Sequence, residues 1–438
     1  MTRVISIAPV VRHEGRSQLV LDIDREGIVS RGDWVGLSPV RGIERLCIGK
    51  KVNAVPTIAA RTCGICPVPH VLAGVGAMEA SIGCEVPRDA LLLRRIIHSA
   101  SRISVHALHA FMVLPDLYYP DTETRINPYS PEPRARAIAG RIQRIREIGQ
   151  TCVQIAGGEA IHPKNPRVGG MYRNISPAAK TRLFDLTKEG RVLAHEHMDC
   201  MISLLRDFAR REWVKIGETR VPVPGNLGYH NQGYLATDPL YGTSSLEENP
   251  SFDLSRYREV SPGAWYRGEG EVTFCDPAYY GGGTQPEGTP FHPARDMCPA
   301  VPLYDGQPVE VGAAARLHRF SRFDEKGTIG QLVARQMECV QAITELEDCI
   351  DALNTSGAVH AGTLSPGTGA LGWAANEAPR GTLVHMVRVK DRKVRFFKMI
   401  VPTAWNMPTA GIACAGSPWQ FAEFIVRGYD PCISCASH

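Results

Sequence analysis

The chain has 438 residues, of which 44% are hydrophobic, enough to bury a substantial core. Its 49 Lys and Arg residues nearly balance 45 Asp and Glu residues, so the net charge is only +4. This balance argues against a nucleic-acid-binding protein, which usually carries a concentrated basic face. The amino-terminal residues lack the apolar segment of a signal peptide, and no apolar run approaches the roughly 20 residues that span a bilayer. We therefore expect a cytoplasmic protein with no transmembrane segment and no nucleic-acid partner.

The first elements in chain order are two predicted strands. Residues 18–23 and 28–35 alternate between apolar and polar side chains and flank the turn sequence Asp24–Gly27. This pattern predicts a small antiparallel sheet. Long amphipathic helices are then predicted over residues 87–114, 133–156, 177–211 and 330–353. The first three begin with proline, which suits the start of a helix.

The region between Val221 and Val311 is rich in Gly and Pro, most densely at Tyr279–Pro290, and is predicted to form surface loops. Residues 382–401 are predicted to be extended, after a loop over residues 374–381. Within them the basic run Arg388–Arg395 is interpreted as an exposed hairpin.

No repeat or composition break divides the chain. The elements together predict an α-rich α+β fold with a central bundle of long helices, a peripheral antiparallel sheet and long loops. We expect residues 1–438 to form a single domain.

Thirteen cysteines, an odd number, are expected to be reduced thiols in a large cytoplasmic chain. Four of them lie in apolar or helical sequence and are interpreted as small buried hydrophobic residues: Cys152, Cys200, Cys339 and Cys349.

Two CxxC pairs have a different pattern. Cys63 and Cys66 are followed by His70, and Cys432 and Cys435 are followed by His438. Each pair places two thiols one short turn apart, so both sulfurs can bind the same metal. Four thiolates are soft donors that select zinc, iron–sulfur clusters or another metal that prefers sulfur.

The spacing weighs against two simpler interpretations. Structural zinc modules usually separate their pairs by roughly 15–20 residues, whereas Cys66 and Cys432 are 366 positions apart (432 − 66). A thioredoxin-like redox pair needs a compact βαβ context, which neither pair has. A four-cysteine zinc site stays open on the residues alone.

The blocks around both pairs resemble the two metal-binding signatures of nickel–iron hydrogenase large subunits. The similarity extends along the chain through seven blocks: Arg12–Gly15, Pro39–Glu44, Arg61–His70, Gly157–Pro163, Glu377–Gly381, Val401–Asn406 and Asp430–His438. The resemblance implies the large-subunit fold of that family and reversible cleavage of dihydrogen at a nickel–iron centre.

The resemblance also implies roles for individual residues. Cys63 and Cys432 would be terminal nickel ligands, and Cys66 and Cys435 would bridge nickel to an iron that carries carbon monoxide and cyanide. Such a centre requires metallocentre assembly proteins.

Arg380 would lie over the open coordination position, with Asp116 and Asp430 as candidates for orienting it. The pocket around the cyanides would be formed by Val401, Pro402 and Thr403.

Glu14 matches the family's proton-relay glutamate beside a terminal cysteine, a task that suits a buried carboxyl group. The alternative is a salt bridge from Glu14 to Arg12 or Arg16. Four histidines are given either packing or proton-transfer roles: His70, His106, His109 and His162.

A second metal site is implied by Glu44, His438 and the carbonyl of Met399, which resemble the ligands of a Mg²⁺ or Fe²⁺ ion. The chain ends at His438, where a maturation protease of this family removes an extension. We therefore expect a processed chain and such a protease as a partner.

Several segments resemble the coenzyme F420-reducing hydrogenases of methanogenic archaea: Val86–Arg95, His106–His109, Gly228–Asn231 and Val301–Val311. The sequence has neither a second cysteine cluster suited to an iron–sulfur relay nor a GxGxxG fingerprint. We therefore expect a small subunit with 4Fe–4S clusters and a subunit with FAD that reduces coenzyme F420.

Alternative acceptors are heterodisulfide reductase or NAD(P). A hydrogen-sensing homologue is a further alternative. A quinone-binding respiratory subunit of the same fold is less favoured, because it would not need all four cysteines.

Overall fold

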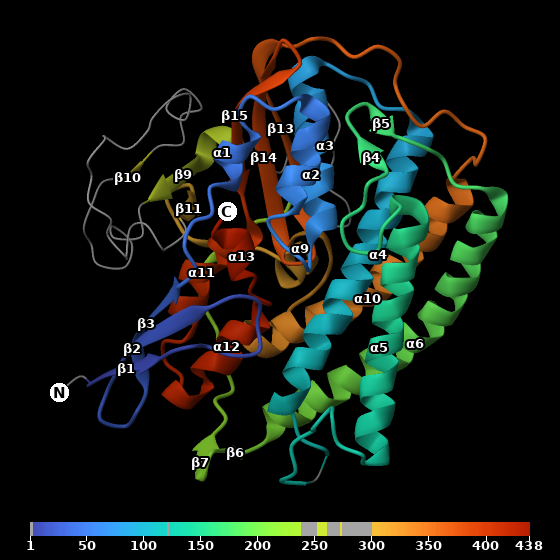
Figure 1. Cartoon of the computed structure of the whole chain (residues 1–438). Helices are drawn as coiled ribbons and strands as arrows, with labels where there is room; N and C mark the ends of the chain where they lie inside the picture. Colours follow the sequence, from blue (N-terminus) through green and yellow to red (C-terminus); the bar gives the residue numbers. More distant parts are fainter. Residues whose placement is uncertain (1–2, 121, 238–251, 261–271, 274–299) are drawn as a thin grey trace.

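The computed structural model describes residues 3–120, 122–237, 252–260, 272–273 and 300–438. Long helices lie side by side in one half of the molecule, and the two three-stranded sheets at the chain's ends lie in the other (Figure 1). In Figure 1 the carboxyl terminus lies inside the outline of the molecule, beside α13 and between the two sheets, whereas the amino terminus lies at the edge.

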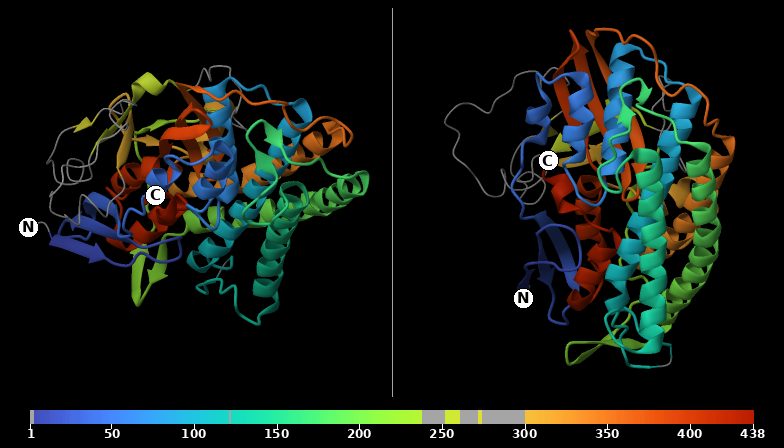
Figure 2. Two further views of the ribbon diagram at one scale, coloured as in Figure 1. Left: turned by 45° about the horizontal axis from the view of Figure 1, so that its top comes forward. Right: turned by 45° about the vertical axis from the view of Figure 1, so that its right-hand side comes forward.

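The four predicted long helices are confirmed to within three residues at each end. They are α4 (Arg88–Val113), α5 (Pro133–Gly157), α6 (Pro177–Arg210) and α10 (Gly327–Ala352). Caps explain two of the starts: the side chains of Glu132 and Ser176 accept hydrogen bonds from the N–H of Ala135 (2.9 Å) and Ala179 (3.2 Å). The second view in Figure 2 shows the helices running along one side of the molecule.

The predicted amino-terminal sheet is confirmed and gains a third strand. The order is β1 (Arg3–Ile7), β2 (Ser17–Ile23), β3 (Val29–Gly36), all antiparallel. Asp24 Oδ1 accepts from the N–H groups of Glu26 and Ile28, both at 2.9 Å, which fixes the turn between β2 and β3.

A second antiparallel sheet contains β13 (Thr368–Ala378), β14 (Gly381–Lys390) and β15 (Lys393–Ile400). The β14–β15 turn confirms the exposed basic hairpin, but the loop predicted over residues 374–381 is wrong, because most of it belongs to β13. Helix α3 (Pro67–Ile82) covers this strand so closely that a Cβ at Gly372 would lie 2.1 Å from Ser81 N. The strand is therefore formed by packing, which its Ala- and Gly-rich sequence does not reveal.

Shorter elements complete the described chain. The helices are α1 (Ile43–Cys47), α2 (Val55–Ala60), α9 (Ala313–Phe320), α11 (Pro402–Ala413), α12 (Ala422–Gly428) and α13 (Ile433–Ala436). The strands are β4 (Pro166–Arg167), β5 (Gly170–Met171), β6 (Trp213–Ile216), β7 (Thr219–Pro222), β8 (Gly233–Tyr234), β9 (Tyr257–Val260), β10 (Val272–Thr273), β11 (Val301–Tyr304) and β12 (Val309–Glu310).

The part of 221–311 that is described has only short strands and one 3₁₀ turn, in line with its Gly and Pro content. The predicted loop at Tyr279–Pro290 lies outside the described residues.

One main hydrophobic cluster draws residues from Val10 to Ala436 and includes all four cysteines of the CxxC pairs. Cys152, Cys339 and Cys349 are buried as expected, while Cys200 is half-buried. The carboxyl-terminal helices thus belong to the core.

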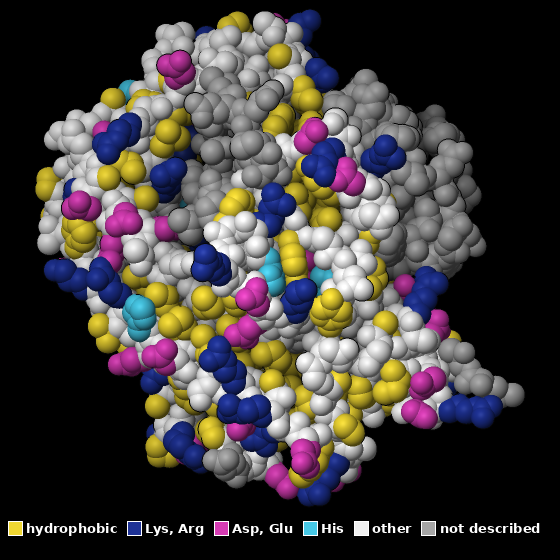
Figure 3. Space-filling view, turned by 180° about the vertical axis from the view of Figure 1, so that it is seen from behind, with side chains coloured by type: hydrophobic (Ala, Val, Ile, Leu, Met, Phe, Trp, Pro, Cys, Tyr) yellow, Lys and Arg dark blue, Asp and Glu magenta, His cyan; other side chains and the backbone are white. Residues whose placement is uncertain are grey.

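Among the described residues, no helix is both long and apolar enough to cross a membrane. On the face shown in Figure 3, Lys and Arg side chains are interspersed with Asp and Glu.

Candidate metal centre

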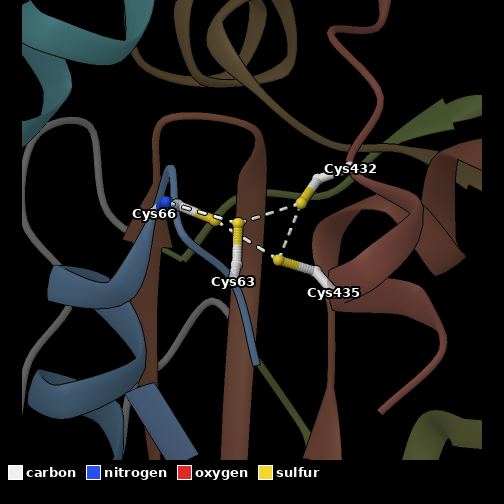
Figure 4. Close-up of side chains that lie close together, drawn as sticks. All are labelled: Cys63, Cys66, Cys432 and Cys435. Atoms are coloured by element: carbon white, nitrogen blue, oxygen red, sulfur yellow. Dashed lines mark hydrogen bonds between the residues drawn. The ribbon is translucent and has the colours of Figure 1, made fainter. Parts of the chain in front are cut away.

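The two CxxC pairs meet inside the fold although they lie at opposite ends of the sequence (Figure 4). Cys63 lies in the turn after α2, and Cys66 precedes α3, whose first residue is Pro67. Cys432 precedes the short helix α13, which carries Cys435. Both pairs therefore present their sulfurs at the start of a helix.

The four sulfurs form one compact group. Cys63 Sγ lies 3.2 Å from Cys432 Sγ, Cys66 Sγ lies 3.3 Å from Cys435 Sγ, and the sulfurs of Cys432 and Cys435 are 3.0 Å apart. Among the described residues this is the one group of three or more potential metal-ligating side chains, and its ligand atoms all lie within 4.8 Å of one another. All four residues are buried.

Arg41 ties the two cysteine segments together. Its Nη2 donates to the carbonyl of Thr62 at 2.6 Å, and its Nε donates to the carbonyl of Ser437 at 3.3 Å. The same Nη2 also donates to the carbonyl of Ser434. One guanidinium thus binds the residue before Cys63 and two residues beside Cys435.

The pKa of Cys63 is shifted in the opposite direction to the pKa values of Cys432 and Cys435. Hydrogen bonding from the sulfur of Cys432 holds the pKa of Cys63 well below 9.0. Burial raises the pKa of Cys432 and of Cys435 well above that value. The cluster therefore releases its first proton readily and retains others until a cation replaces them, as expected of a metal site.

Arg380 approaches the sulfur group from the turn between β13 and β14. Its Nη2 binds Asp430 Oδ1 at 3.0 Å, and its Nε donates to the Asp430 carbonyl at 2.7 Å. Its Nη1 is buried with no hydrogen-bond partner among the described residues. Burial works against the charge, but Asp430 and then Cys432 outweigh it and raise the pKa of Arg380.

Asp430 and not Asp116 holds Arg380. The carboxylate of Asp116 binds Arg12 through distances of 2.5 and 2.9 Å and Arg427 through 2.8 and 3.0 Å. The expected contact from Asp116 to Arg380 is therefore wrong, because two other guanidinium groups occupy that carboxylate.

Two buried arginines that the sequence did not single out hold the peptide just before Arg380. Arg316 donates to the carbonyls of Ala378 (3.0 Å) and Pro379 (3.3 Å), and Arg335 donates to that of Pro379 (3.3 Å). Arg316 also binds Glu338 and Glu377. The position of Arg380 thus depends on a buried charge network.

Glu14 lies beside Cys432, as the sequence predicts. Its Oε2 accepts from Cys432 Sγ at 3.2 Å and from Ser434 N at 2.9 Å, and its Oε1 accepts from Ser434 Oγ. Backbone bonds join Glu14 N to the Pro431 carbonyl (3.3 Å) and Ile433 N to the Glu14 carbonyl (3.0 Å). Arg12 pairs with Asp116, so a salt bridge between Arg12 and Glu14 does not form.

Gly15 allows the segment that carries Glu14 to lie close to the segment that carries Cys432. A Cβ at this residue would lie 2.6 Å from Ile433 Cβ, and its φ of 86° suits glycine.

The segment Val401–Thr403 starts helix α11 next to the carboxyl-terminal pair. Val401 precedes the helix and Pro402 is its first residue. Thr403 Oγ1 accepts a hydrogen bond of 3.0 Å from the N–H of Cys432. All three residues are buried.

The residues of the second predicted metal site also lie close together. Glu44 Oε1 lies 3.1 Å from His438 Nε2 and accepts from Met399 N at 2.7 Å. In an antiparallel strand the N–H and C=O of one residue point to the same side, so the Met399 carbonyl faces the same edge. Lys398 Nζ is 3.9 Å from this oxygen and 2.9 Å from Glu259. Burial opposes ionisation, but Lys398 and His438 outweigh it and lower the pKa of Glu44 to about 2.

The remaining candidate histidines have packing partners in the core. His70 lies 3.2 Å from His385, His106 Nε2 lies 2.6 Å from Glu338, and His109 Nε2 lies 2.7 Å from the Arg427 carbonyl. Burial lowers the pKa of each to about 4. His162 is half-buried.

Comparison with known proteins agrees with this geometry. Residues 41–151 and 318–419 match the nickel-dependent hydrogenase family. The coenzyme F420 hydrogenase subunit alpha of Methanosarcina barkeri is 54% identical, over 100% of this chain and 96% of its own length. The protein of the same name from Methanothermobacter thermautotrophicus is 37% identical, over 100% and 95%. The reduced nickel–iron–selenium hydrogenase of Desulfomicrobium baculatum shares the fold, with a TM-score of 0.79 and 19% identity over the whole of both chains.

Fold and site together define a class of metalloprotein in which four buried thiols from both ends of a helix-rich chain form one metal centre. The donors fit a metal that prefers sulfur, and Arg380 Nη1, which has no hydrogen-bond partner in the described part of the chain, leaves a donor near the sulfurs. The chain belongs to the nickel-dependent hydrogenase large-subunit family and is an enzyme, a nickel–iron hydrogenase.

Proposed function

We propose that this chain is the catalytic large subunit of a cytoplasmic nickel–iron hydrogenase that oxidises dihydrogen reversibly and passes the electrons to coenzyme F420 through partner subunits. The convergence of four buried cysteine sulfurs is the observation that carries the hydrogenase function. The assignment of coenzyme F420 as the electron acceptor rests on the full-length similarity to two proteins named coenzyme F420 hydrogenase subunit alpha.

In this proposal the four sulfurs of Cys63, Cys66, Cys432 and Cys435 would hold the nickel, with Cys63 and Cys432 as its terminal ligands and Cys66 and Cys435 shared with an iron that would carry carbon monoxide and cyanide. Bound there, the centre supplies heterolytic cleavage of dihydrogen. The buried segment Val401–Thr403 would line the pocket for the iron's diatomic ligands, since the Thr403 hydroxyl accepts a hydrogen bond from Cys432 N.

The chain's own residues move the proton and orient the pocket. Cys432 Sγ takes the proton, and Glu14, at 3.2 Å, receives it. Ser434 holds the Glu14 carboxylate in place. Arg380, fixed by Asp430, would offer to the reaction site its Nη1, which has no hydrogen-bond partner among the described residues, and would keep a positive charge there.

Glu44, His438 and the Met399 carbonyl hold Mg²⁺ or Fe²⁺ near the carboxyl terminus. A carboxylate and a carbonyl suit a hard cation, and the imidazole admits iron. Lys398 already supplies one positive charge to Glu44, so we expect weak binding at this site.

The partners in this scheme are a small subunit with 4Fe–4S clusters, an FAD-bearing subunit that reduces coenzyme F420, assembly proteins and a maturation protease. The curated relatives are named as alpha subunits, which implies further subunits. We also propose that the chain forms a single domain over residues 1–438, which is supported by one main hydrophobic cluster that draws described residues from Val10 to Ala436.

Metal analysis with a matched pair of variants tests the proposed centre. The purified complex should contain nickel and iron and show infrared bands of bound carbon monoxide and cyanide. Cys63→Ser should lose nickel, whereas Cys339→Ser should retain it, because Cys339 is equally buried but lies outside the sulfur group. Zinc alone, or full nickel in Cys63→Ser, would contradict the proposal.

The acceptor is tested separately. The complex should reduce coenzyme F420 with dihydrogen faster than it reduces NAD or NADP. Rapid turnover with a nicotinamide alone would refute the acceptor and leave the metal centre intact, and slow turnover with every acceptor would indicate a sensor.

Glu14→Gln tests the proton route. The amide retains the hydrogen bonds to Ser434 but cannot carry the proton, so metals should remain while hydrogen/deuterium exchange is suppressed. Undiminished exchange would remove Glu14 from the route.

A further inference from the structure

One face of helix α4 carries a row of four buried titratable side chains. They are His98, Arg102, His106 and His109, and each is at most 3% exposed. Their spacings of four, four and three residues place them above one another on a single side of the helix. The proton route through Glu14 uses none of them.

The hydrogen bond to Glu338 fixes the protonation of His106. Burial opposes the charge of Glu338, but Arg316 outweighs it and holds the pKa of Glu338 well below 4.5, so this carboxylate only accepts. His106 Nε2, at 2.6 Å from Glu338 Oε2, therefore carries the ring proton. Burial lowers the pKa of His106 to about 4, which leaves the ring neutral at pH 7. Its Nδ1 is then a buried acceptor, and it has no partner among the described residues.

His109 has the same arrangement one turn further along. Its Nε2 donates to the Arg427 carbonyl at 2.7 Å, and burial lowers its pKa to about 4. Its Nδ1 is a second buried acceptor with no partner in the described part of the chain. Arg102 has the opposite need, because its Nε–H is a buried donor that no described residue accepts. Buried polar groups are normally satisfied, so these three atoms call for a ligand.

Water is the ligand that matches the three atoms. A water molecule can accept from Arg102 Nε and donate to His106 Nδ1, and a second can donate to His109 Nδ1. A metal cation would lie against the Arg102 guanidinium, and an anion has no proton to donate to the two imidazole nitrogens. Only a small neutral molecule that both donates and accepts fits the whole row.

The two ends of the row lie in different surroundings. At one end Glu345, which is half-buried, accepts from Ser99 Oγ at 2.9 Å and from Arg102 Nη1 at 3.4 Å. At the other end, the charge of Asp430 has the largest effect after burial on the pKa of His109, and it raises that pKa. Because Asp430 holds Arg380, the row extends from the protein surface to the neighbourhood of the metal centre.

We propose that ordered water molecules bind along this face of α4 and, with the imidazoles of His106 and His109, form a second proton route between the surface at Glu345 and the metal centre. Each water accepts one proton and releases another, and an imidazole that takes up a proton on Nδ1 returns it to the next water, so no other reactant is needed. The Glu338 carboxylate stabilises the imidazolium of His106 in that step. The proton role rests on the proposed hydrogenase function, whereas the water sites do not.

A structure of the purified complex at a resolution that shows ordered water tests the binding sites without a mutation. Water oxygens should lie within about 3.2 Å of Arg102 Nε, His106 Nδ1 and His109 Nδ1. A row without water would overturn the proposal, whatever the nickel content of the complex.

Hydrogen/deuterium exchange in the Glu14→Gln variant tests the proton role, because this variant leaves only other routes. Adding His106→Gln should lower the remaining exchange roughly tenfold or more, since the amide keeps a hydrogen bond to Glu338 but cannot take up the proton. His197→Gln is the matched control, because His197 is as buried as His106 but lies on α6. Equal exchange in the two double variants would overturn the proposal.

The outcomes for the two routes are distinguishable. Complete loss of exchange in Glu14→Gln alone would overturn the second route and leave the Glu14 route intact. Undiminished exchange in Glu14→Gln would refute the Glu14 route, and His106→Gln must then still lower exchange. Should His106→Gln lose its nickel, His109→Gln provides the same comparison.

Discussion

Replacing Arg316 by Met should destabilise the protein strongly, because it removes one buried positive charge. Arg316 is 1% exposed and lies 2.5 and 2.6 Å from the Glu338 carboxylate and 2.9 Å from that of Glu377. Both carboxylates are fully buried. Met fills a similar volume but leaves two carboxylates without their common counter-ion.

The magnitude follows from these contacts. Removing one partner of a buried ion pair costs about 3–5 kcal/mol. An unfolding entropy of about 2.1 cal/mol/K per residue gives about 0.9 kcal/mol/K for a chain of this length. The thermal midpoint should therefore fall by about 3–5 °C. Because Arg316 also holds the Ala378 and Pro379 carbonyls, Arg380 loses part of its support and turnover should fall as well.

Differential scanning calorimetry of three variants tests this reasoning. Arg144→Met is the control, because Arg144 pairs with Glu189 at the surface, where an ion pair contributes about 1 kcal/mol or less. Adding Glu377→Gln to Arg316→Met should restore part of the stability, since it removes one of the unpaired charges. An unchanged midpoint in Arg316→Met, or strictly additive losses in the double variant, would refute the account.

Three further predictions concern packing, pH and the arginine at the centre. Gly372→Ala should cost about 1–3 kcal/mol by overpacking, because its Cβ would lie 2.1 Å from Ser81 N, while Gly362→Ala, with no heavy atom within 4 Å, should be neutral in the same thermal assay. Burial lowers the pKa of His197 from 6.5 to about 4, so only the unfolded chain binds this proton between those values. His197 alone should therefore cost about 2 kcal/mol of stability at pH 5 relative to pH above 6.5, and His197→Gln should remove that share of the loss between pH 7 and 5, while the other buried histidines keep theirs. Asp430→Asn should keep nickel but lower turnover and the thermal midpoint, because Arg380 and Arg335 lose the carboxylate at 3.0 and 3.8 Å; an unchanged midpoint would contradict this.

Local patterns predicted the elements that local physics determines. The spacing of apolar residues predicted the long helices, and prolines marked the start of three of them. The alternation of apolar and polar residues on either side of the turn at Asp24 predicted β2 and β3. The two CxxC pairs predicted a shared metal because each spacing already brings two sulfurs together. Glu14 was found through its resemblance to a family block, since the residues alone also allowed a salt bridge.

Contacts between segments that lie far apart in the chain could not be predicted from the sequence. Asp116 was matched to Arg380, but its oxygens bind Arg12 and Arg427, which lie 104 and 311 positions away. No sequence motif marks Ser434, Lys398 or Arg316. Their roles come from the residues that they contact in the folded chain. The strand at residues 374–378 likewise depends on α3 lying across it.

The two chain ends are joined by protein contacts on either side of the cysteines. Glu14, on the segment before β2, forms backbone bonds on both sides of Cys432, and Arg41 binds Thr62, Ser434 and Ser437. Burial raises the pKa of Cys432 and of Cys435, so a cation that binds there must displace their protons, and metal binding should release protons and add stability. Because Glu14 and Arg41 hold the carboxyl-terminal segment through protein groups alone, we expect amide exchange at residues 430–438 to stay slow when the metal is removed. Fast exchange there in the metal-free chain would show that the metal, and not Arg41 and Glu14, joins the two ends.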